Sequence, residues 1–262
     1  MLLTIDIGNT NMVLGVFDGE TIVEHWRIAT VPDRTADEIA VVLHGLLQQS
    51  VIRESDLHGI SLCSTVPSVL HEMREVCRKY YGDRPTVIVE PGVKTGVPIR
   101  YDNPKEVGSD RIMNSLAAVH LYGGPAIVVD FGTSTNFDAV SAKGEFVGGA
   151  LAPGIEISVD ALARRAAQLL KVELTRPPRI IGKSTVEALQ SGIVYGFAGQ
   201  VEGITRRMAA ELSPDNPDAV TIIATGGLAP LVIDEVGLID AFEPWLTLIG
   251  LRLTFERNAT DG

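Results

Sequence analysis

The stretch LLTIDIGNTN, residues 2–11, decides the fold, because an apolar run ends there in an aspartate and a tight polar turn. Residues 2–5 are typical of a buried β-strand, and Asp6 follows at its end. Gly8 and the small polar residues after it predict a turn whose backbone N–H groups can bind a nucleotide phosphate. The carboxylate can hold a hydrated Mg²⁺ beside that phosphate. For a single copy, an ordinary hairpin with a solvated aspartate explains the pattern equally well.

The pattern returns about half a chain later in AIVVDFGTST, residues 126–135. Aligning the two stretches matches Asp130 with Asp6 and gives each copy a glycine two residues further on. A third glycine-rich strand end, IIATGG, carries Gly226 and Gly227, which let the backbone pass close to an adenine or a ribose. Two such copies favour a duplicated α/β domain over coincidence, with residues 1–115 and 116–262 as the expected domains.

Residue periodicity predicts the elements of each half. The first half should fold as β-β-β-α-β-α-β, with a hairpin at Asp18 and Gly19 and a capping box that joins Thr35 to Glu38. The second half begins with a strand and a hairpin whose turn lies around residues 142–144. It continues with helices over residues 154–170 and about 185–212, a strand in 219–227, a short helix and a final apolar run at 245–255.

Composition limits the class of protein. The 262 residues carry 22 Lys and Arg against 33 Asp and Glu, a formal net charge of −11, which disfavours binding to nucleic acid or to anionic lipid. No stretch approaches the roughly 18 apolar residues of a membrane span, and polar residues break the first apolar run, so we expect a cytoplasmic protein. Cys63 and Cys77 predict reduced, structural thiols, and the scattered histidines predict no zinc site.

The paired Asp-x-Gly turns and the later ATGG segment resemble the acetate and sugar kinase, Hsp70 and actin superfamily. This resemblance implies an α/β fold of duplicated ribonuclease H-like, or actin-like ATPase, domains with mixed sheets and an inter-domain ATP cleft. More specifically, the chain resembles type III pantothenate kinase along nearly its whole length, through DIGNTN, GVPIRYDNPKEVGSDR, DFGTSTNFDAV, GGALAPG and GKSTVEALQSG. Each motif alone is weak, and their order and spacing make the match specific.

The resemblance implies which residues bind ATP and its cations. The first turn holds the ATP phosphates, with Asp6 near Mg²⁺, and Thr133 adds a second ATP contact. Asp130 matches the family's ligand for a monovalent cation, K⁺ or NH₄⁺, which neutralises phosphate charge beside the magnesium. The implied ATP-binding residues of the first turn are Asp6, Ile7, Gly8, Asn9, Thr10, Asn11, Met12 and Val13.

The resemblance also implies the pantothenate contacts and the catalytic residue, for which Asp110 matches the proposed general base. From the sequence alone, Asp110 stands just before an apolar-periodic run and is equally explained as a helix N-cap. Arg111 fits an anionic substrate carboxylate, and a plain surface cation is the alternative. The implied substrate-binding residues are Tyr101, Gly108, Ser109, Asp110, Arg111 and Thr185.

The GKST segment at residues 182–185 resembles the end of a Walker A loop, but Pro177 stands where that motif needs glycine. We therefore interpret Ser184 or Thr185 as the cap of the following helix. Two departures from the family pattern are visible, because Ser109 replaces the more usual alanine and the second turn carries Ser134 and Asn136. Neither departure removes a charged group, so both bear only on the fine placement of the substrate.

These observations lead to one favoured function and two alternatives. The favoured hypothesis is an ATP-dependent kinase that phosphorylates pantothenate to 4'-phosphopantothenate, the first step of coenzyme A biosynthesis, and that forms a homodimer as the family does. A nucleotide-binding transcriptional accessory or regulatory protein of the same fold is the first alternative, and the retained carboxylates argue against it. A kinase or phosphatase that acts on a sugar or an acyl acid is the second, and the GSDR and GGALAPG segments argue against that one.

Overall fold

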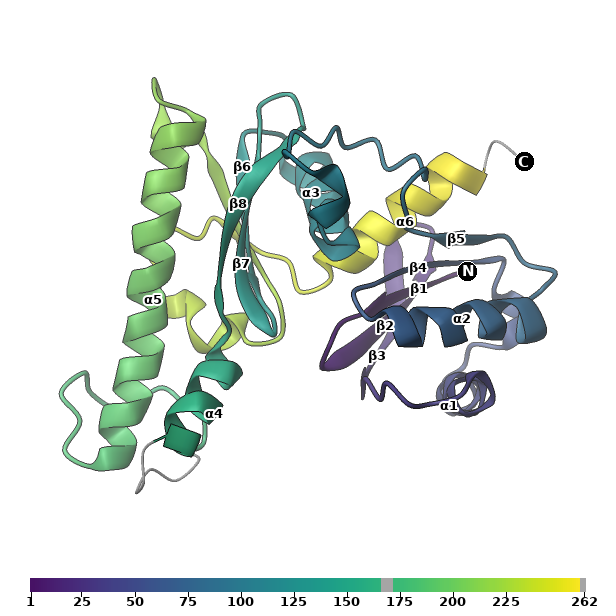
Figure 1. Ribbon diagram of the computed structural model, residues 1–262, viewed down its shortest axis with the longest axis horizontal. Helices are drawn as coiled ribbons and strands as arrows, with labels where there is room; N and C mark the ends of the chain where they lie inside the picture. Colours follow the sequence, from purple (N-terminus) through teal and green to yellow (C-terminus); the bar gives the residue numbers. More distant parts are fainter. Residues whose placement is uncertain (166–171, 260–262) are drawn as a thin grey trace. The chain divides into compact units, whose positions relative to one another are not determined.

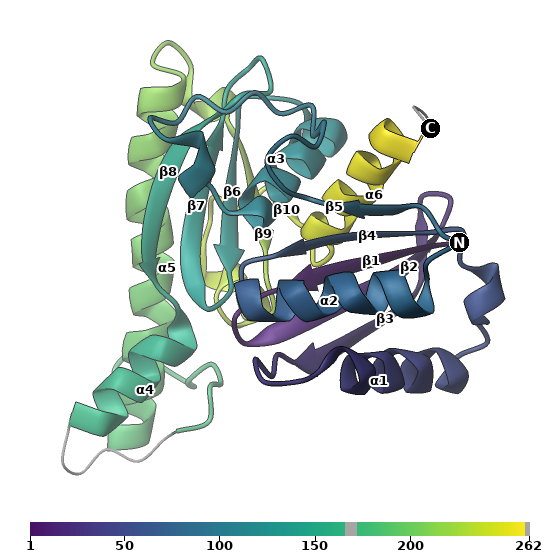
Figure 2. The same ribbon diagram turned by 45° about the vertical axis from the view of Figure 1, so that its right-hand side comes forward.

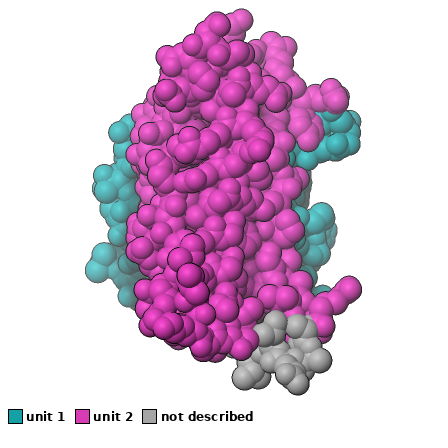
Figure 3. Space-filling model, turned by 90° about the vertical axis from the view of Figure 1, so that its left-hand side faces the viewer, with its two compact units in different colours: residues 1–97, 103–117, 246–262 teal, residues 98–102, 118–245 magenta. Residues whose placement is uncertain are grey.

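The computed structural model describes residues 1–165 and 172–259, and its elements follow the expected order (Figures 1 and 2). The chain divides into two compact units, which Figure 3 shows in different colours. Unit 1 comprises residues 1–97, 103–117 and the C-terminal segment from residue 246, and unit 2 comprises residues 98–102 and 118–245. This division differs from the expected break after residue 115, because the C-terminal helix packs on the first sheet rather than on the second.

Unit 1 is built on a five-stranded mixed sheet in the order β3-β2-β1-β4-β5. The strands are β1 (Leu2–Ile7), β2 (Asn11–Asp18), β3 (Thr21–Ala29), β4 (Gly59–Ser64) and β5 (Thr86–Ile88). β1, β2 and β3 are antiparallel neighbours, whereas β4 runs parallel to β1 and β5 parallel to β4. Gly19 in the β2–β3 turn has a φ of 59°, the left-handed conformation that this tight hairpin requires. The predicted β-β-β-α-β-α-β order is confirmed.

Different helices cover the two faces of this sheet (Figure 2). Side chains alternate between the faces along a strand, and one face packs its apolar residues against α1 (Ala36–Gln49) and α2 (Pro67–Tyr80). The residues that β1 contributes to this apolar core are Leu3, Ile5 and Ile7. The other face carries Thr4 and Asp6 and is covered by α6 (Leu246–Ala259), which contacts β1, β2, β4 and β5. Ser61 on that face donates a hydrogen bond of 2.8 Å to the backbone carbonyl of Leu251.

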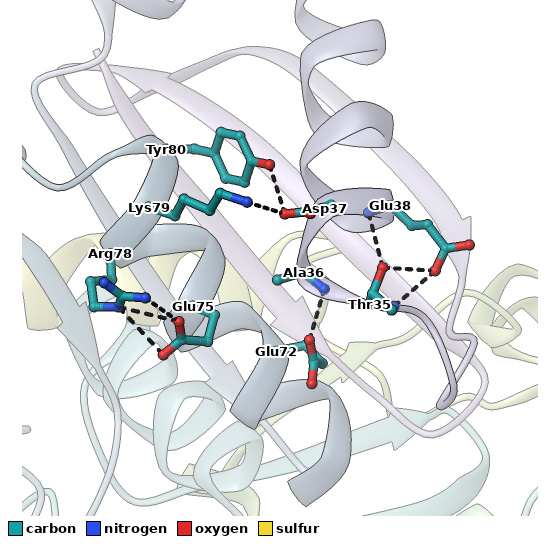
Figure 4. A network of polar contacts seen from close by, with 9 residues as sticks. All are labelled: Thr35, Ala36, Asp37, Glu38, Glu72, Glu75, Arg78, Lys79 and Tyr80. Carbon is teal, nitrogen blue, oxygen red and sulfur yellow. Dashed lines mark hydrogen bonds and ion pairs between the residues drawn. The ribbon is translucent and has the colours of Figure 1, made fainter.

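Polar contacts tie the beginning of α1 to the end of α2 (Figure 4). Thr35 and Glu38 form the predicted capping box, with the Thr35 side chain bonded to the Glu38 N–H and the Glu38 carboxylate bonded to the Thr35 N–H. Asp37 accepts hydrogen bonds of 2.7 Å from Lys79 Nζ and from the Tyr80 hydroxyl. These contacts fix where α1 begins and hold it beside α2.

Unit 2 is built on a second five-stranded mixed sheet, in the order β10-β9-β6-β7-β8. The strands are β6 (Ala126–Phe131), β7 (Ser134–Val140), β8 (Phe146–Pro153), β9 (Thr221–Thr225) and β10 (Ala241–Phe242). The long helix α5 (Thr185–Leu212) packs against β6 and β7, and α4 (Ile155–Arg165) packs against α5 (Figure 1). Both predicted helices are present, and the part of the first that was expected over residues 166–170 lies outside the described residues.

The helix α3 and several short 3₁₀ turns complete the described elements. α3 (Ser109–Tyr122) begins in unit 1 and ends in unit 2. The 3₁₀ turns are η1 (Glu54–Asp56), η2 (Pro104–Glu106), η3 (Pro217–Ala219), η4 (Ala229–Leu231) and η5 (Ile233–Glu235). The short helix that was expected after β9 corresponds to η4 and η5. No helix in the described ranges combines the length and the apolar character needed to cross a membrane.

The two sheets repeat one strand arrangement, which confirms the duplication predicted from the sequence. β6 pairs antiparallel with β7 and parallel with β9, as β1 pairs antiparallel with β2 and parallel with β4. Asp6 and Asp130 are each the last residue but one of the central strand in their unit. The alignment of LLTIDIGNTN with AIVVDFGTST is therefore an alignment of equivalent positions in the two units.

The capping box gives a first testable prediction. Thr35→Ala should lower the free energy of unfolding by about 1 kcal/mol, because the Glu38 N–H loses its acceptor. Thr35→Ser keeps the hydroxyl and should retain most of the stability. Urea denaturation of the two variants and the wild-type protein measures the difference, and equal losses in both variants would contradict a role for the cap.

Candidate active site

The turn after β1 is held in shape by hydrogen bonds from both of its sides. The Gly8 N–H donates to the Asn11 carbonyl at 3.0 Å, and the Thr30 hydroxyl donates to the Gly8 carbonyl at 2.7 Å. The Thr30 N–H donates to the Thr10 carbonyl at 3.0 Å. Asn9 and Thr10 are exposed at the tip. The predicted phosphate-binding turn is thus a fixed loop whose tip is open to a ligand.

Asp6, at the base of this turn, is contacted from the neighbouring strand. It lies in register with Cys63 on β4, and the Cys63 thiol donates to Asp6 Oδ1 over an Sγ–O distance of 3.4 Å. The pKa of Asp6 is raised to about 7, mainly by burial and then by the negative charge of Asp110, while the Cys63 hydrogen bond opposes the rise. Two carboxylates that oppose each other's ionisation in a partly buried place are typical of functional sites.

Asp110 lies in the first turn of α3, so its prediction as an N-cap is wrong. The Ile112 N–H donates to the Gly108 carbonyl at 3.2 Å, which starts the helix at Ser109 and makes Asp110 its second residue. Asp110 Oδ1 accepts a hydrogen bond of 2.9 Å from the Arg111 N–H. A Cβ at Gly108 would overlap Asp110 Oδ1, so glycine leaves the room that this carboxylate occupies. Burial raises the pKa of Asp110, and the Arg111 N–H and charge oppose that rise.

The neighbours of Asp110 on α3 also point to a site rather than to a surface. Arg111 is 8% exposed, which excludes its interpretation as a plain surface cation. The Ser109 hydroxyl donates to the Ser64 carbonyl at 3.4 Å. Residues 108–111 are therefore gathered with the base of the Asp6 turn inside unit 1.

Asp130, the equivalent aspartate of unit 2, has different neighbours from Asp6. Gly226 has a φ of 93°, and a Cβ built there would lie 2.6 Å from Asp130 Oδ1 and 2.6 Å from the Phe131 carbonyl oxygen. Only glycine fits at position 226, because the Asp130 carboxylate and the Phe131 backbone approach it closely. The Gly132 N–H donates to the Ser134 carbonyl at 3.0 Å and closes the turn after β6.

The GGALAPG segment supports the site residues of unit 2 by close approach. A Cβ at Gly154 would overlap the Thr133 carbonyl, so the strand β8 passes directly against the second turn. Tyr101 packs against Phe146 with ring centroids 6.0 Å apart, and a Cβ at Gly148 would meet the Tyr101 ring at 3.9 Å. Two glycines of this motif, Gly154 and Gly148, therefore lie in close contact with Thr133 and Tyr101.

The cap of α5 follows the sequence prediction. The Ser184 side chain accepts a hydrogen bond of 3.2 Å from the Glu187 N–H, so the GKST segment caps a helix and the Walker A reading stays rejected. Thr185 is the first residue of α5 and is exposed. Its implied contact with the substrate remains a prediction.

The residues of each unit suit the cations that the resemblance implies. No group of three or more His, Cys, Asp or Glu side chains forms a metal site among the residues described. Mg²⁺ needs no such group, because it keeps several waters and takes one or two carboxylates, and a cation beside Asp6 would offset the charge repulsion with Asp110. Asp130 Oδ1 and the Phe131 carbonyl oxygen, both beside Gly226, are ligands of the kind that hard cations prefer.

Comparison with known proteins decides the family. The model of the family described as type III pantothenate kinase matches residues 2–207. The chain belongs to the type III pantothenate kinase family. A protein of this family from Streptomyces avermitilis, named type III pantothenate kinase, is 68% identical over 98% of both chains. A protein of the same name from Streptomyces coelicolor is 67% identical over 99% of both chains.

Solved structures show the fold of this family member. The activator of 2-hydroxyisocaproyl-CoA dehydratase from Clostridium difficile, with bound ADPNP, matches 99% of the chain and 96% of its own at 14% identity and a TM-score of 0.51. Together with the repeated mixed sheets, this likeness confirms the predicted actin-like ATPase fold.

Sequence reasoning missed the residues that support the site. Cys63 was expected to be only a buried structural thiol, and its thiol contacts the Asp6 carboxylate. Thr30 and Gly154 were not predicted. Thr30 holds the turn after β1 by a hydrogen bond, and the absence of a side chain at Gly154 leaves room for the turn after β6. The alternation of Gly59, Ser61 and Cys63 along β4 is a signal that could have placed small residues on the face of Asp6.

The raised pKa of Asp6 predicts how the stability of the metal-free protein depends on pH. The folded protein holds the Asp6 proton more tightly than the unfolded chain, so stability should fall as the pH rises from about 4 to about 7 and then level off. The Asp6→Asn variant lacks this dependence. The difference in the free energy of unfolding, variant minus wild type, should therefore increase by about 2 to 4 kcal/mol as the pH rises from about 4 to about 7.

Urea denaturation in EDTA at several pH values measures this difference. Asp37→Asn is the matched control, because Lys79 and Tyr80 lower the pKa of Asp37 and its removal gives no gain as the pH rises. A difference between Asp6→Asn and wild type that stays constant with pH would contradict the shift.

Proposed function

We propose that this protein transfers the γ-phosphoryl group of ATP to the terminal hydroxyl of pantothenate and so forms 4'-phosphopantothenate, the first step of coenzyme A biosynthesis. The observation that carries the proposal is the partly buried Asp110 carboxylate at the start of α3, within the unit that also contains the Asp6 turn, in a member of this family. The regulatory alternative is not favoured, because the similar proteins are named as kinases.

Asp110 is proposed as the general base. Burial raises its pKa above the ordinary value of an aspartate, which suits a group that accepts a proton from the attacking hydroxyl. The Arg111 N–H donates to Oδ1 and fixes its direction, and the N-terminal end of α3 favours the ionised carboxylate. Arg111 would bind the carboxylate of pantothenate, because its guanidinium matches that geometry. Tyr101, Gly108, Ser109 and Thr185 are proposed as the further substrate contacts.

Asp6 and its turn are proposed to bind Mg²⁺–ATP. The backbone of residues 6–13 would bind the phosphates through its N–H groups, and Asp6 would hold the hydrated magnesium. The metal supplies charge neutralisation for phosphoryl transfer, in which positioning and electrostatics do most of the catalysis. Thr133 is proposed as a second contact with ATP. Asp130 and the Phe131 carbonyl, whose oxygens lie beside Gly226, are proposed to bind K⁺ or NH₄⁺.

A homodimer and a cytoplasmic location complete the proposal. Support for the dimer comes from apolar side chains of unit 2 that a second copy would cover. They are Leu151, Ile157, Leu162, Ile180, Ile181 and Val186, with exposed fractions between 45% and 78%. The mass measured by gel filtration with light scattering tests the assembly. The location follows from the ATP and the pantothenate that the reaction consumes.

The release of ADP from purified protein tests the reaction. Pantothenate should support turnover with Mg²⁺ and K⁺, and a panel of sugars and short acyl acids should not. Turnover with a sugar and none with pantothenate would assign the site to another kinase of the fold. ATP binding without turnover on any acceptor would favour the regulatory alternative.

The Asp110→Asn variant tests the general base. We expect its turnover to fall by roughly a hundredfold or more while ATP binding stays nearly intact, because the amide cannot accept the proton. Asp102→Asn, an exposed carboxylate in a loop of unit 2, should keep wild-type turnover. Steady-state rates and ATP titrations of both variants provide the measurement, and wild-type turnover in Asp110→Asn would show the assignment to be wrong.

The monovalent cation site gives a further prediction. Replacing K⁺ with Na⁺ should raise the KM for ATP, because the smaller ion fits the oxygens beside Gly226 less well. The Asp130→Asn variant should show little difference between the two salts at equal ionic strength. If the wild-type protein behaves identically in K⁺ and Na⁺, Asp130 does not have this role.

A further inference from the structure

Cys63 occupies a position from which a side chain acts directly on Asp6. The two residues are partners in the parallel pairing of β1 with β4, on the sheet face opposite the apolar core of α1 and α2. Cys63 is fully buried, so its thiol has no access to water. The thiol donates to Asp6 Oδ1 over 3.4 Å, which is an ordinary distance for a hydrogen bond from sulfur.

A second contact joins this end of β4 to the helix that carries the proposed base. The hydroxyl of Ser109, the residue before Asp110, donates at 3.4 Å to the carbonyl of Ser64, the residue after Cys63. The beginning of α3 is therefore held beside the strand end that carries Cys63. Asp6, Cys63, Ser64 and Ser109 all belong to unit 1.

We propose that Cys63 is a positioning residue for Mg²⁺–ATP, whose thiol holds Asp6 Oδ1 and thereby directs Oδ2 toward the hydrated magnesium. This inference rests on the proposed function, since it assumes that Asp6 binds the metal.

The chemistry of a thiol suits this task. The terminal torsion of an aspartate is soft, so a carboxylate with no donor on either oxygen can rotate. A lysine or arginine at this position would fix the carboxylate, but its charge would compete with the cation. A thiol in its ordinary protonated form is an uncharged donor. It thus orients Asp6 without neutralising it.

Cys77 provides a matched control within the same unit. It is also a buried free cysteine, at 6% exposure, but it lies on α2 in the apolar core. Its removal costs core packing and leaves the Asp6 carboxylate untouched. Any effect that appears in Cys63 variants and not in Cys77→Ala therefore concerns the hydrogen bond rather than the loss of a buried sulfur.

Calorimetric binding of a non-hydrolysable ATP analogue, with Mg²⁺ and separately in EDTA, tests the inference. Cys63→Ala and Cys63→Val both lack the donor and should bind the analogue about fivefold more weakly with Mg²⁺, as expected for one lost hydrogen bond. In EDTA they should bind it as the wild type does. Cys63→Ser restores a donor and should bind within about twofold of wild type. Cys77→Ala should show no change.

The outcomes separate this inference from the function on which it rests. Wild-type affinity in Cys63→Ala or Cys63→Val, an equal loss with and without Mg²⁺, or the same loss in Cys77→Ala would each overturn the positioning role. If one of the two donor-free variants does not fold, the other carries the test. Asp6→Asn should lose the Mg²⁺-dependent part of binding, and if it does not, the proposed metal role of Asp6 fails together with the inference. A loss in Asp6→Asn alone overturns the inference and leaves the proposed function standing.

Discussion

The alternation of side chains along β1 is the constraint on which the rest of the structure depends. Leu3, Ile5 and Ile7 enter the apolar core, so Asp6 must lie on the other face, beside Cys63 of the parallel neighbour. A shift of one residue in this pairing would move the carboxylate into the apolar core and the isoleucines out of it. The register that stabilises the core is thus the register that presents the carboxylate at the end of the sheet.

This arrangement has an electrostatic cost that the folded protein retains. Asp6 and Asp110 are both carboxyl groups whose pKa burial raises, and the charge of Asp110 raises the pKa of Asp6 further. A protein selected for stability alone would gain by replacing one of them, because each ionised buried carboxylate lowers the stability of the metal-free protein. The pair is explained if a cation and a phosphate chain occupy the site and offset the repulsion.

The duplication gives the two units one topology and different neighbours for the equivalent aspartates. The residue paired with Asp6 on the parallel strand is Cys63, whereas the residue paired with Asp130 is Thr225, whose hydroxyl donates to the Glu243 carbonyl instead. In unit 2 the Asp130 carboxylate lies directly against Gly226. One backbone pattern therefore supports a carboxylate that accepts from a thiol in unit 1 and a carboxylate packed against a glycine in unit 2.

The sequence by itself determined what depends on near neighbours in the chain. The hairpin at Gly19, the capping box at Thr35 and the cap of α5 at Ser184 were predictable, because each rests on contacts within a few residues. The motifs also identified the family and its aspartates. Only the tertiary structure decided that Cys63 bonds to Asp6 and that the C-terminal helix joins unit 1. These features depend on strand register and on the packing of segments far apart in the chain, and local patterns do not encode either.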